Sequence, residues 1–175
     1  MNGASRLLMV LCFCFVAVSP AVHAQESATV KATATVMTTL IINAMNNLQF
    51  GSVSPGVNKS VDKTDVGFAG EWSIVGAPSA EIAVNFSLPT EMVTADSLSS
   101  MTMTFNSTDA SYEDGTGGGQ TAPAGLINPI WPTTRNIGAG GTLSVWIGGT
   151  VEPTISQTGG DYSADVILTI AYTGG

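Results

Sequence analysis

An alternation of apolar and polar residues runs through most of the chain and restricts it to β structure. Over residues 28–42 most even positions are apolar, whereas the odd positions begin with threonine and lysine. A period of two is typical of a strand with one buried face. Because this run is longer than the roughly 3–10 residues of most strands, we expect it either to break into two strands or to extend beyond its own domain.

Shorter runs with the same period follow, and no later stretch has helical periodicity. We expect strands at residues 48–53, 71–75, 81–88, 100–105, 142–151 and 162–172. Turn-forming residues divide them, and residues 54–67 and 107–125 are predicted loops. The sequence therefore predicts an all-β fold, an immunoglobulin-like antiparallel β-sandwich of about seven strands.

The first 24 residues have the features of a secretory signal peptide. Arg6 supplies a basic start, an apolar run covers residues 7–18, and small residues precede a cleavage site between Ala24 and Gln25. The apolar run is shorter than the roughly 20 residues that span a bilayer, so we do not expect an integral membrane protein. We expect one exported domain at 25–175, located in the periplasm, at the cell surface or outside the cell.

The residues that follow the leader include few side chains that could act in catalysis or bind zinc. Cys12, Cys14 and the only histidine, His23, all lie within residues 1–24. Without imidazole or thiol the domain lacks the base of a hydrolytic triad and the usual zinc ligands. The 13 acidic residues outnumber the 5 basic ones, which disfavours nucleic-acid binding. We therefore expect no enzyme activity, no cofactor, no metal and no nucleic-acid partner.

Two further features are candidates for ligand binding, an acidic stretch and the tryptophans. Residues 109–115 (DASYEDG) contain the acids of a calcium loop, but the glycine falls one position late and Gln120 stands where the last glutamate is needed, so an acidic turn is expected. Of the three tryptophans, Trp72 and Trp146 are expected in the sandwich. Trp131 lies in an irregular region and is the candidate for stacking on a ligand.

Three stretches carry a resemblance to a known family: ATATVMTTLIINAMNNLQFGSVSPG (32–56), LSVWIGGTVEP (143–153) and GGDYSADVILTIAY (159–172). They contain an Ala/Thr-alternating start, an L-x-F-G turn followed by P-G, a G-G-T hairpin and a G-x-Y strand that ends in tyrosine. The chain resembles a secreted bacterial domain of unknown function that is in turn similar to fimbrial subunits of the spore-coat-U-like, archaic chaperone-usher type.

In such subunits the sandwich lacks its last strand, and the N-terminal extension of the next subunit fills the gap. The resemblance implies a non-enzymatic structural subunit of a fimbria-like or adhesive cell-surface assembly. Its partners would be other copies of itself or related subunits, with a periplasmic chaperone and usher. Residues 25–36 become the donor segment, with a strand-donor face of Ala28, Val30, Ala32, Ala34 and Val36. The acceptor edge is assigned to Tyr162, Val166, Leu168, Ile170 and Tyr172.

The composition of the last predicted strand also points to an edge that is paired. Beyond Asp161 it has a single charge, Asp165, and it lacks the lysine and proline that guard exposed edges in monomers. Two alternatives follow. If residues 28–36 of a neighbouring copy cover the edge, the protein polymerises by strand addition. If the same residues of its own chain cover it, the protein is a self-complete secreted sandwich that binds a glycan or a surface protein.

Overall fold

The computed structural model describes residues 28–34 and 36–174. The chain divides into two units, Met1–Thr35 and Val36–Gly175, and each is described by itself. In the first unit, residues 28–34 are all exposed and form no strand. The predicted leader and its cleavage site at Ala24 and Gln25 lie outside the described residues. Among the described residues there is no helix that is long and apolar enough to cross a membrane.

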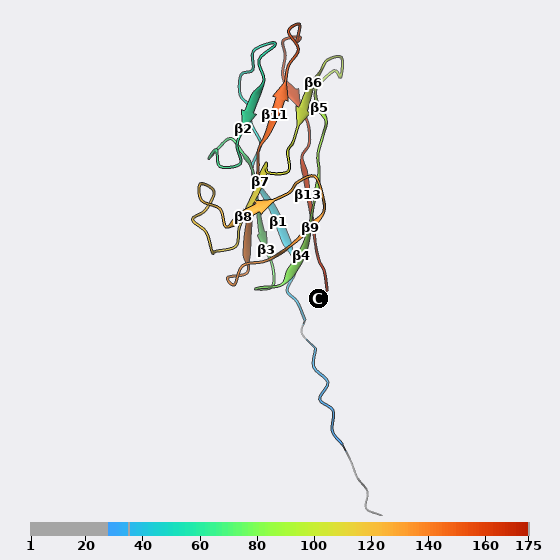
Figure 1. Ribbon diagram of the computed structural model, residues 1–175. Helices are drawn as coiled ribbons and strands as arrows, with labels where there is room; N and C mark the ends of the chain where they lie inside the picture. The colour runs from blue at the N-terminus through green and yellow to red at the C-terminus, as the bar shows by residue number, and fades with distance from the viewer. Residues whose placement is uncertain (1–27, 35, 175) are drawn as a thin grey trace, which may run out of the picture. The chain divides into compact units, whose positions relative to one another are not determined.

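The second unit consists of thirteen strands that pair only in the antiparallel sense within its described part, which confirms the predicted all-β fold (Figure 1). Sheet A has the order β1 (Ile41–Asn46), β3 (Gly70–Val75), β10 (Thr142–Ile147), β7 (Ala110–Glu113), β8 (Gly125–Ile127). Sheet B has the order β12 (Tyr162–Ser163), β5 (Glu91–Thr94), β6 (Ser100–Thr104), β11 (Gly149–Glu152), β2 (Lys59–Val61). Sheet C has the order β13 (Ile167–Tyr172), β4 (Glu81–Ser87), β9 (Thr133–Asn136).

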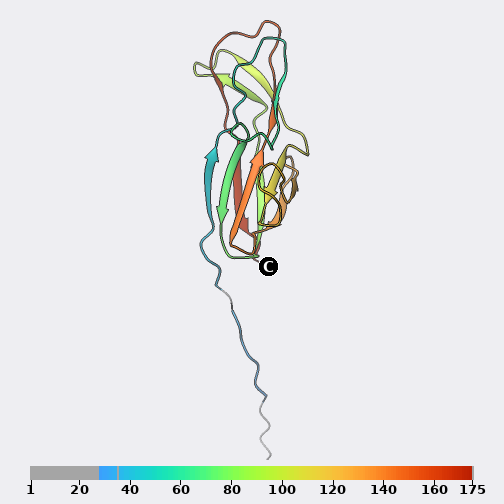
Figure 2. The ribbon, with the colours of Figure 1, turned by 90° about the vertical axis from the view of Figure 1, so that its left-hand side faces the viewer.

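Sheets A and C form two layers with the main core between them. In Figure 2, β3 and β10 lie in front of β13, and β1 lies beside β3. The alternate residues of these strands meet in one cluster, in which Ile74 of β3, Val84 of β4 and Val145 of β10 are fully buried. A second, smaller cluster underlies sheet B and contains Phe50, Val61, Ala69, Met101, Met103 and Val151. The period-two pattern thus buries one face of each sheet, as expected for a sandwich.

The predicted strand at 142–151 is interrupted by Gly148, where the chain passes from sheet A into sheet B. A Cβ atom at this position would overlap the carbonyl oxygen of Val61 and lie 2.9 Å from the backbone nitrogen of Lys63. The Gly148 N–H donates to the carbonyl of Asp109 at 2.8 Å instead of joining a ladder. Only glycine permits this close approach of two backbones.

The prediction of a strand over residues 28–42 was wrong for its described residues before Ile41. β1 begins at Ile41 because its partner β3 ends at Val75, the residue opposite Ile41. The next residue, Gly76, donates its N–H to the carbonyl of Gly141 at 3.0 Å and does not continue the ladder with Leu40. The apolar side chains that alternate in this segment are therefore exposed in the described structure: Val30 is 90% exposed and Val36 is 93% exposed.

Other differences from the sequence prediction concern short elements. Residues 48–53 form no strand, although Phe50 is buried in the second cluster. The predicted strand at 162–172 divides into β12 and β13, which belong to different sheets. Strands of three or four residues, such as β2 and β7, lie within the predicted loops. β5 and β9 lie in residues for which neither a strand nor a loop was predicted, and the count rises from about seven to thirteen.

Substitution of Gly148 by alanine tests the close approach at the junction of sheets A and B. We expect the free energy of unfolding to fall by about 1–3 kcal/mol, since the added methyl group must displace a backbone carbonyl. Gly140→Ala is the matched control, because nothing lies within 4 Å of a Cβ atom there. Urea unfolding measures both variants, and equal stabilities would contradict the tight junction.

Candidate functional site

The first and last strands of the second unit are each paired on one side only within the described residues. β1 is the edge of sheet A next to β3, and β13 is the edge of sheet C next to β4. The two edges approach each other at Gly76, where a Cβ atom would lie 2.6 Å from Tyr172 Oη and 2.9 Å from Leu40 Cδ1. The backbone N–H and C=O groups along the outer sides of both strands are free to bind a further strand.

Apolar side chains between these two edges are only half buried. Leu40 and Ile42 beside β1, and Val166, Ile170 and Tyr172 beside β13, pack against the main core yet remain partly exposed. Trp72 of β3 and Phe86 of β4 meet edge to face with ring centroids 5.9 Å apart and so join the two layers beneath them. The core is thus closed along β3 and β4 and open toward β1 and β13.

A hollow of about 460 Å³ opens in the same region. Ala44, Asn46 and the residues that follow β1 form one wall, and residues 162–166 form the other. Trp72, Met92 and Met103 also line it. Segments from the two ends of the second unit therefore border one depression, whose lining mixes polar and apolar side chains.

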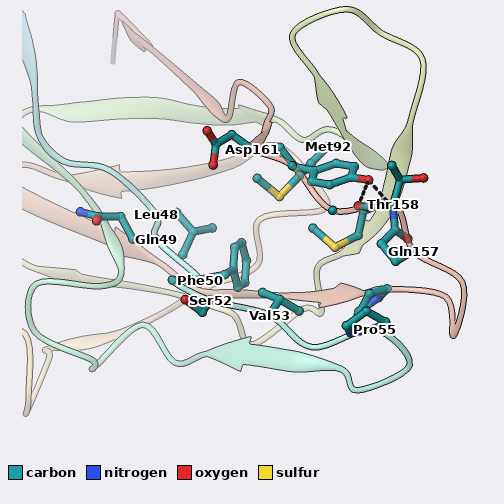
Figure 3. Close-up of a pocket in the computed structure, with 16 residues that line it drawn as sticks. Leu48, Gln49, Phe50, Ser52, Val53, Pro55, Met92, Gln157, Thr158 and Asp161 are labelled. Carbon is teal, nitrogen blue, oxygen red and sulfur yellow. Dashed lines mark hydrogen bonds between the residues drawn. The ribbon is translucent and has the colours of Figure 1, made fainter.

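A second hollow of about 690 Å³ continues from the first and shares Leu48, Gln49, Phe50, Met92 and Tyr162 with it. Figure 3 shows residues 48–55 on one side and residues 157–162 on the other. The hydroxyl of Tyr162 donates to the carbonyl of Thr158 at 2.7 Å and accepts from Gln157 Nε2 at 2.7 Å. These bonds fix the wall that the C-terminal part contributes. We call the two adjoining hollows the edge groove.

The edge groove carries little charge. Asp161 lines the larger hollow and Asp165 the smaller, and no lysine or arginine lines either hollow in the described structure. The groove therefore suits an extended segment with few charges, and those positive.

The predicted acceptor edge is distributed over two sheets. Leu168, Ile170 and Tyr172 lie on the core-facing side of β13, opposite Phe86, Val84 and Ile82 of β4 respectively. Val166 precedes β13 and packs against both core clusters. Tyr162 belongs to β12 and pairs with Thr94 in sheet B, because the chain changes sheets between residues 163 and 167. Of the five residues, Tyr162 and Val166 line the edge groove, whereas Leu168, Ile170 and Tyr172 do not.

The predicted donor face is exposed wherever the structure describes it. Ala28, Val30, Ala32, Ala34 and Val36 are all exposed and belong to no strand. The groove and this apolar face are thus both without a covering layer in the described residues.

The tryptophans occupy three different environments. Trp146 is buried, with 5% of its surface exposed, and Trp72 is half buried at the edge groove. Trp131 is 69% exposed between β8 and β9. It is the most exposed of the three tryptophans.

The calcium-loop stretch 109–115 is largely the strand β7. Glu113 accepts hydrogen bonds from the backbone N–H groups of Gly115 at 2.6 Å and Gly117 at 2.9 Å. Asp109 accepts from the N–H of Asn106 at 2.7 Å. Among the described residues there is no group of three or more acids, histidines or cysteines that could hold a metal ion. The acids of this stretch organise backbone turns.

No family model matches this chain, and no curated protein matches it either.

Sequence reasoning did not identify the floor of the edge groove. Phe50, Met92 and Met101 come from three separate segments and line the larger hollow together. Phe50 belongs to the L-x-F-G turn, a motif that carries the family resemblance and does not indicate a groove. Met101 lies in the predicted strand at 100–105, and the alternation of this strand predicts a buried side chain. Alternation cannot show that the layer above that side chain is incomplete.

The turn around Glu113 predicts a pH effect. The N–H of Gly117 first, with those of Gly115 and Gly119, lowers the pKa of Glu113 below its ordinary value of 4.5. A lowered pKa stabilises the fold above the ordinary value, and this contribution is lost as the pH falls through the folded-state pKa. Glu113→Gln should therefore weaken the acid dependence of the melting temperature. The change is small, because the carboxylate remains in contact with solvent.

Glu91→Gln is the control for Glu113→Gln, since no hydrogen bond of the Glu91 side chain occurs in the described structure. Thermal melts of both variants between pH 3 and pH 7 provide the comparison. An unchanged acid dependence in Glu113→Gln would contradict the proposed role of the turn.

Proposed function

We propose that this protein is a non-enzymatic, exported structural subunit that polymerises by strand addition into a fimbria-like or other cell-surface assembly. Residues 28–36 of one copy would lie in the edge groove of the next, between β1 and β13. This is the arrangement that the resemblance to spore-coat-U-like, archaic chaperone-usher subunits implies. The observation that carries the proposal is the edge groove, which lies beside β1, together with the unpaired edges of β1 and β13 in the described second unit.

An added strand would pair with the free backbone groups of the strand edges and would also cover the exposed apolar side chains. Its backbone would pair with the free edges of β1 and β13, while alternate side chains would enter the depression and fix the register. Ile42, Trp72 and Ile170 would then lose their remaining contact with water. Burial of apolar surface provides the driving force, at about 25 cal/mol per Å².

The segment 28–36 has the complementary properties. Its apolar face contains Val30 and Val36, whose exposed side chains would each contribute about 1.5–3 kcal/mol on full burial. Its single charge is Lys31, on the opposite face. That positive charge matches the acidic rim formed by Asp161 and Asp165. The polar threonines alternate with the apolar positions and would remain toward solvent.

Reversal of the polarity of the donor face should abolish assembly. We expect the double variant Val30→Asp, Val36→Asp to weaken association at least about a hundredfold, since it removes about 3 kcal/mol or more of apolar burial. Size-exclusion chromatography with light scattering, over a range of concentrations, measures the effect on protein expressed from the full-length gene. Thr29→Asp, Thr33→Asp adds the same charge to the opposite face and should retain assembly.

A synthetic peptide of residues 28–36 provides a second readout. Added to a chain that lacks these residues, it should raise the melting temperature, because a ligand that binds only the folded state stabilises it. The same peptide with aspartate at positions 30 and 36 should not. Identical behaviour of all chains and peptides would refute strand addition.

The exposed ring of Trp131 supports a second candidate function, a secreted binding module for a glycan or a surface protein. In that case the binding surface would be the turn between β8 and β9, and the ring would stack on the apolar face of a sugar.

Trp131→Ala tests this alternative. We expect a module of this kind to lose glycan binding about tenfold or more on an immobilised glycan panel, with an unchanged melting temperature because the ring packs little surface. Trp131→Phe, which keeps an aromatic face, should retain part of the binding. Absence of binding by the parent protein to any glycan or surface extract would remove the alternative.

A further inference from the structure

We infer that three loop tips at one end of sheet B form a contact surface for a neutral lipid bilayer. The tips are Val57, Leu98 and Ile155, and we call them the aliphatic tips. They project from the loops 54–58, 95–99 and 153–158, respectively. This surface lies at the end of the second unit opposite to the C-terminus (Figure 1). The inference goes beyond the proposed function, since the strand edges of β1 and β13 take no part in it.

Each aliphatic tip exposes most of its side chain to solvent. Val57 is 59% exposed, Leu98 is 83% exposed and Ile155 is 90% exposed. A single exposed aliphatic residue is ordinary on a protein surface, whereas several at one place mark contact with a protein or a membrane. The apex of a turn is usually occupied by Gly, Pro, Asn, Asp or Ser. Three large aliphatic residues at such positions therefore point to an apolar partner.

The loop that carries Leu98 is a closed turn, held by hydrogen bonds. The carboxylate of Asp96 accepts from Thr94 Oγ1 at 2.7 Å and from the Leu98 N–H at 3.1 Å. The N–H of Thr94 donates to the carbonyl of Ser99 at 3.0 Å, and the N–H of Ser97 donates to the carbonyl of Thr94 at 2.8 Å. The backbone is thus fixed on both sides of Leu98 and presents its side chain to solvent.

Hydrogen bonds also join the three loops to one another. In the first loop the Gly56 N–H donates to the carbonyl of Thr154 in the third loop, at 3.0 Å. The Gln157 side chain accepts from the Thr154 N–H at 3.2 Å and donates to the carbonyl of Ser100, directly after the second loop, at 2.9 Å. Figure 1 and Figure 2 both show the three loops at the same end. The aliphatic tips therefore belong to one surface.

The composition of the three loops favours lipid acyl chains over other partners. The loops contain no aromatic residue and no arginine, the residues that dominate binding to proteins and sugars. They also contain no lysine, so they lack the cations that attract anionic headgroups. Their one ionisable residue is Asp96, whose carboxylate is bonded within its own loop. The hydrocarbon of a neutral bilayer requires only apolar side chains that reach it, and projecting tips meet this requirement.

Binding to vesicles of phosphatidylcholine tests the inference on protein expressed from the full-length gene. We expect the parent to sediment with these vesicles. Leu98→Ser, Ile155→Ser should bind at least about tenfold more weakly, because the burial of two large aliphatic side chains is lost. Val66→Ser, Leu126→Ser is the matched control, since both side chains are exposed aliphatics outside the three loops, and it should bind like the parent. Melting temperatures should be unchanged in both variants.

A fluorescent label locates the contact. The sequence has no cysteine after Cys14, so Leu98→Cys can be labelled with an environment-sensitive dye and compared with Thr134→Cys, an exposed position of β9. Vesicles whose acyl chains carry a nitroxide should quench the label at position 98 and leave the label at position 134 unchanged. Anionic lipid added to the vesicles should not strengthen binding, because the loops have no cation.

The vesicle comparison is repeated in the Val30→Asp, Val36→Asp background, so that neither assembly nor the exposed valines of residues 28–36 contribute. The same tenfold difference is expected there, and failure of the proposed function leaves this result intact. No binding of the parent to any vesicle, equal binding by the tip variant and its control, or quenching of both labels would overturn the inference. So would a tip variant that weakens association between copies and leaves vesicle binding unchanged.

Discussion

An apolar side chain on the inner face of a strand is stabilised only when a second layer covers it, and the second unit meets this requirement unevenly. Near β3, β4 and β10 the two layers cover each other completely, as the fully buried Ile74 and Val145 show. Toward β1 and β13 the cover thins, and Ile42 and Ile170 remain half buried. The edge groove follows from this imbalance.

The sequence predicted the elements whose burial follows directly from their own alternation. The strands at 71–75, 81–88 and 100–105 correspond to β3, β4 and β6, since each has alternate residues in a core cluster. Strand pairing is a property of two segments, however. The alternation before Ile41 could not reveal that β3 ends at Val75. Likewise, the break at Gly148 depends on the carbonyl of Val61, a residue far away in the sequence.

The same limit explains what was predictable of the site. Alternation placed Leu168, Ile170 and Tyr172 on one face of the last strand, and the structure places them opposite β4. It also extended that strand to Tyr162, which belongs to sheet B. Phe50 and Met92 could not be assigned to a groove from the sequence, because a groove exists only where segments such as 44–53 and 157–166 lie across from each other.

The floor of the edge groove has a further consequence. Met92, Met101 and Met103 lie around its hollows, and methionine is unbranched, with a polarisable thioether and several rotatable bonds. Such a floor adjusts its shape to side chains of different volume. A groove built in this way can hold alanines at some positions and valines at others without a rigid pocket for each. The methionine side chains of the floor therefore allow the same position of the groove to accept side chains of different size.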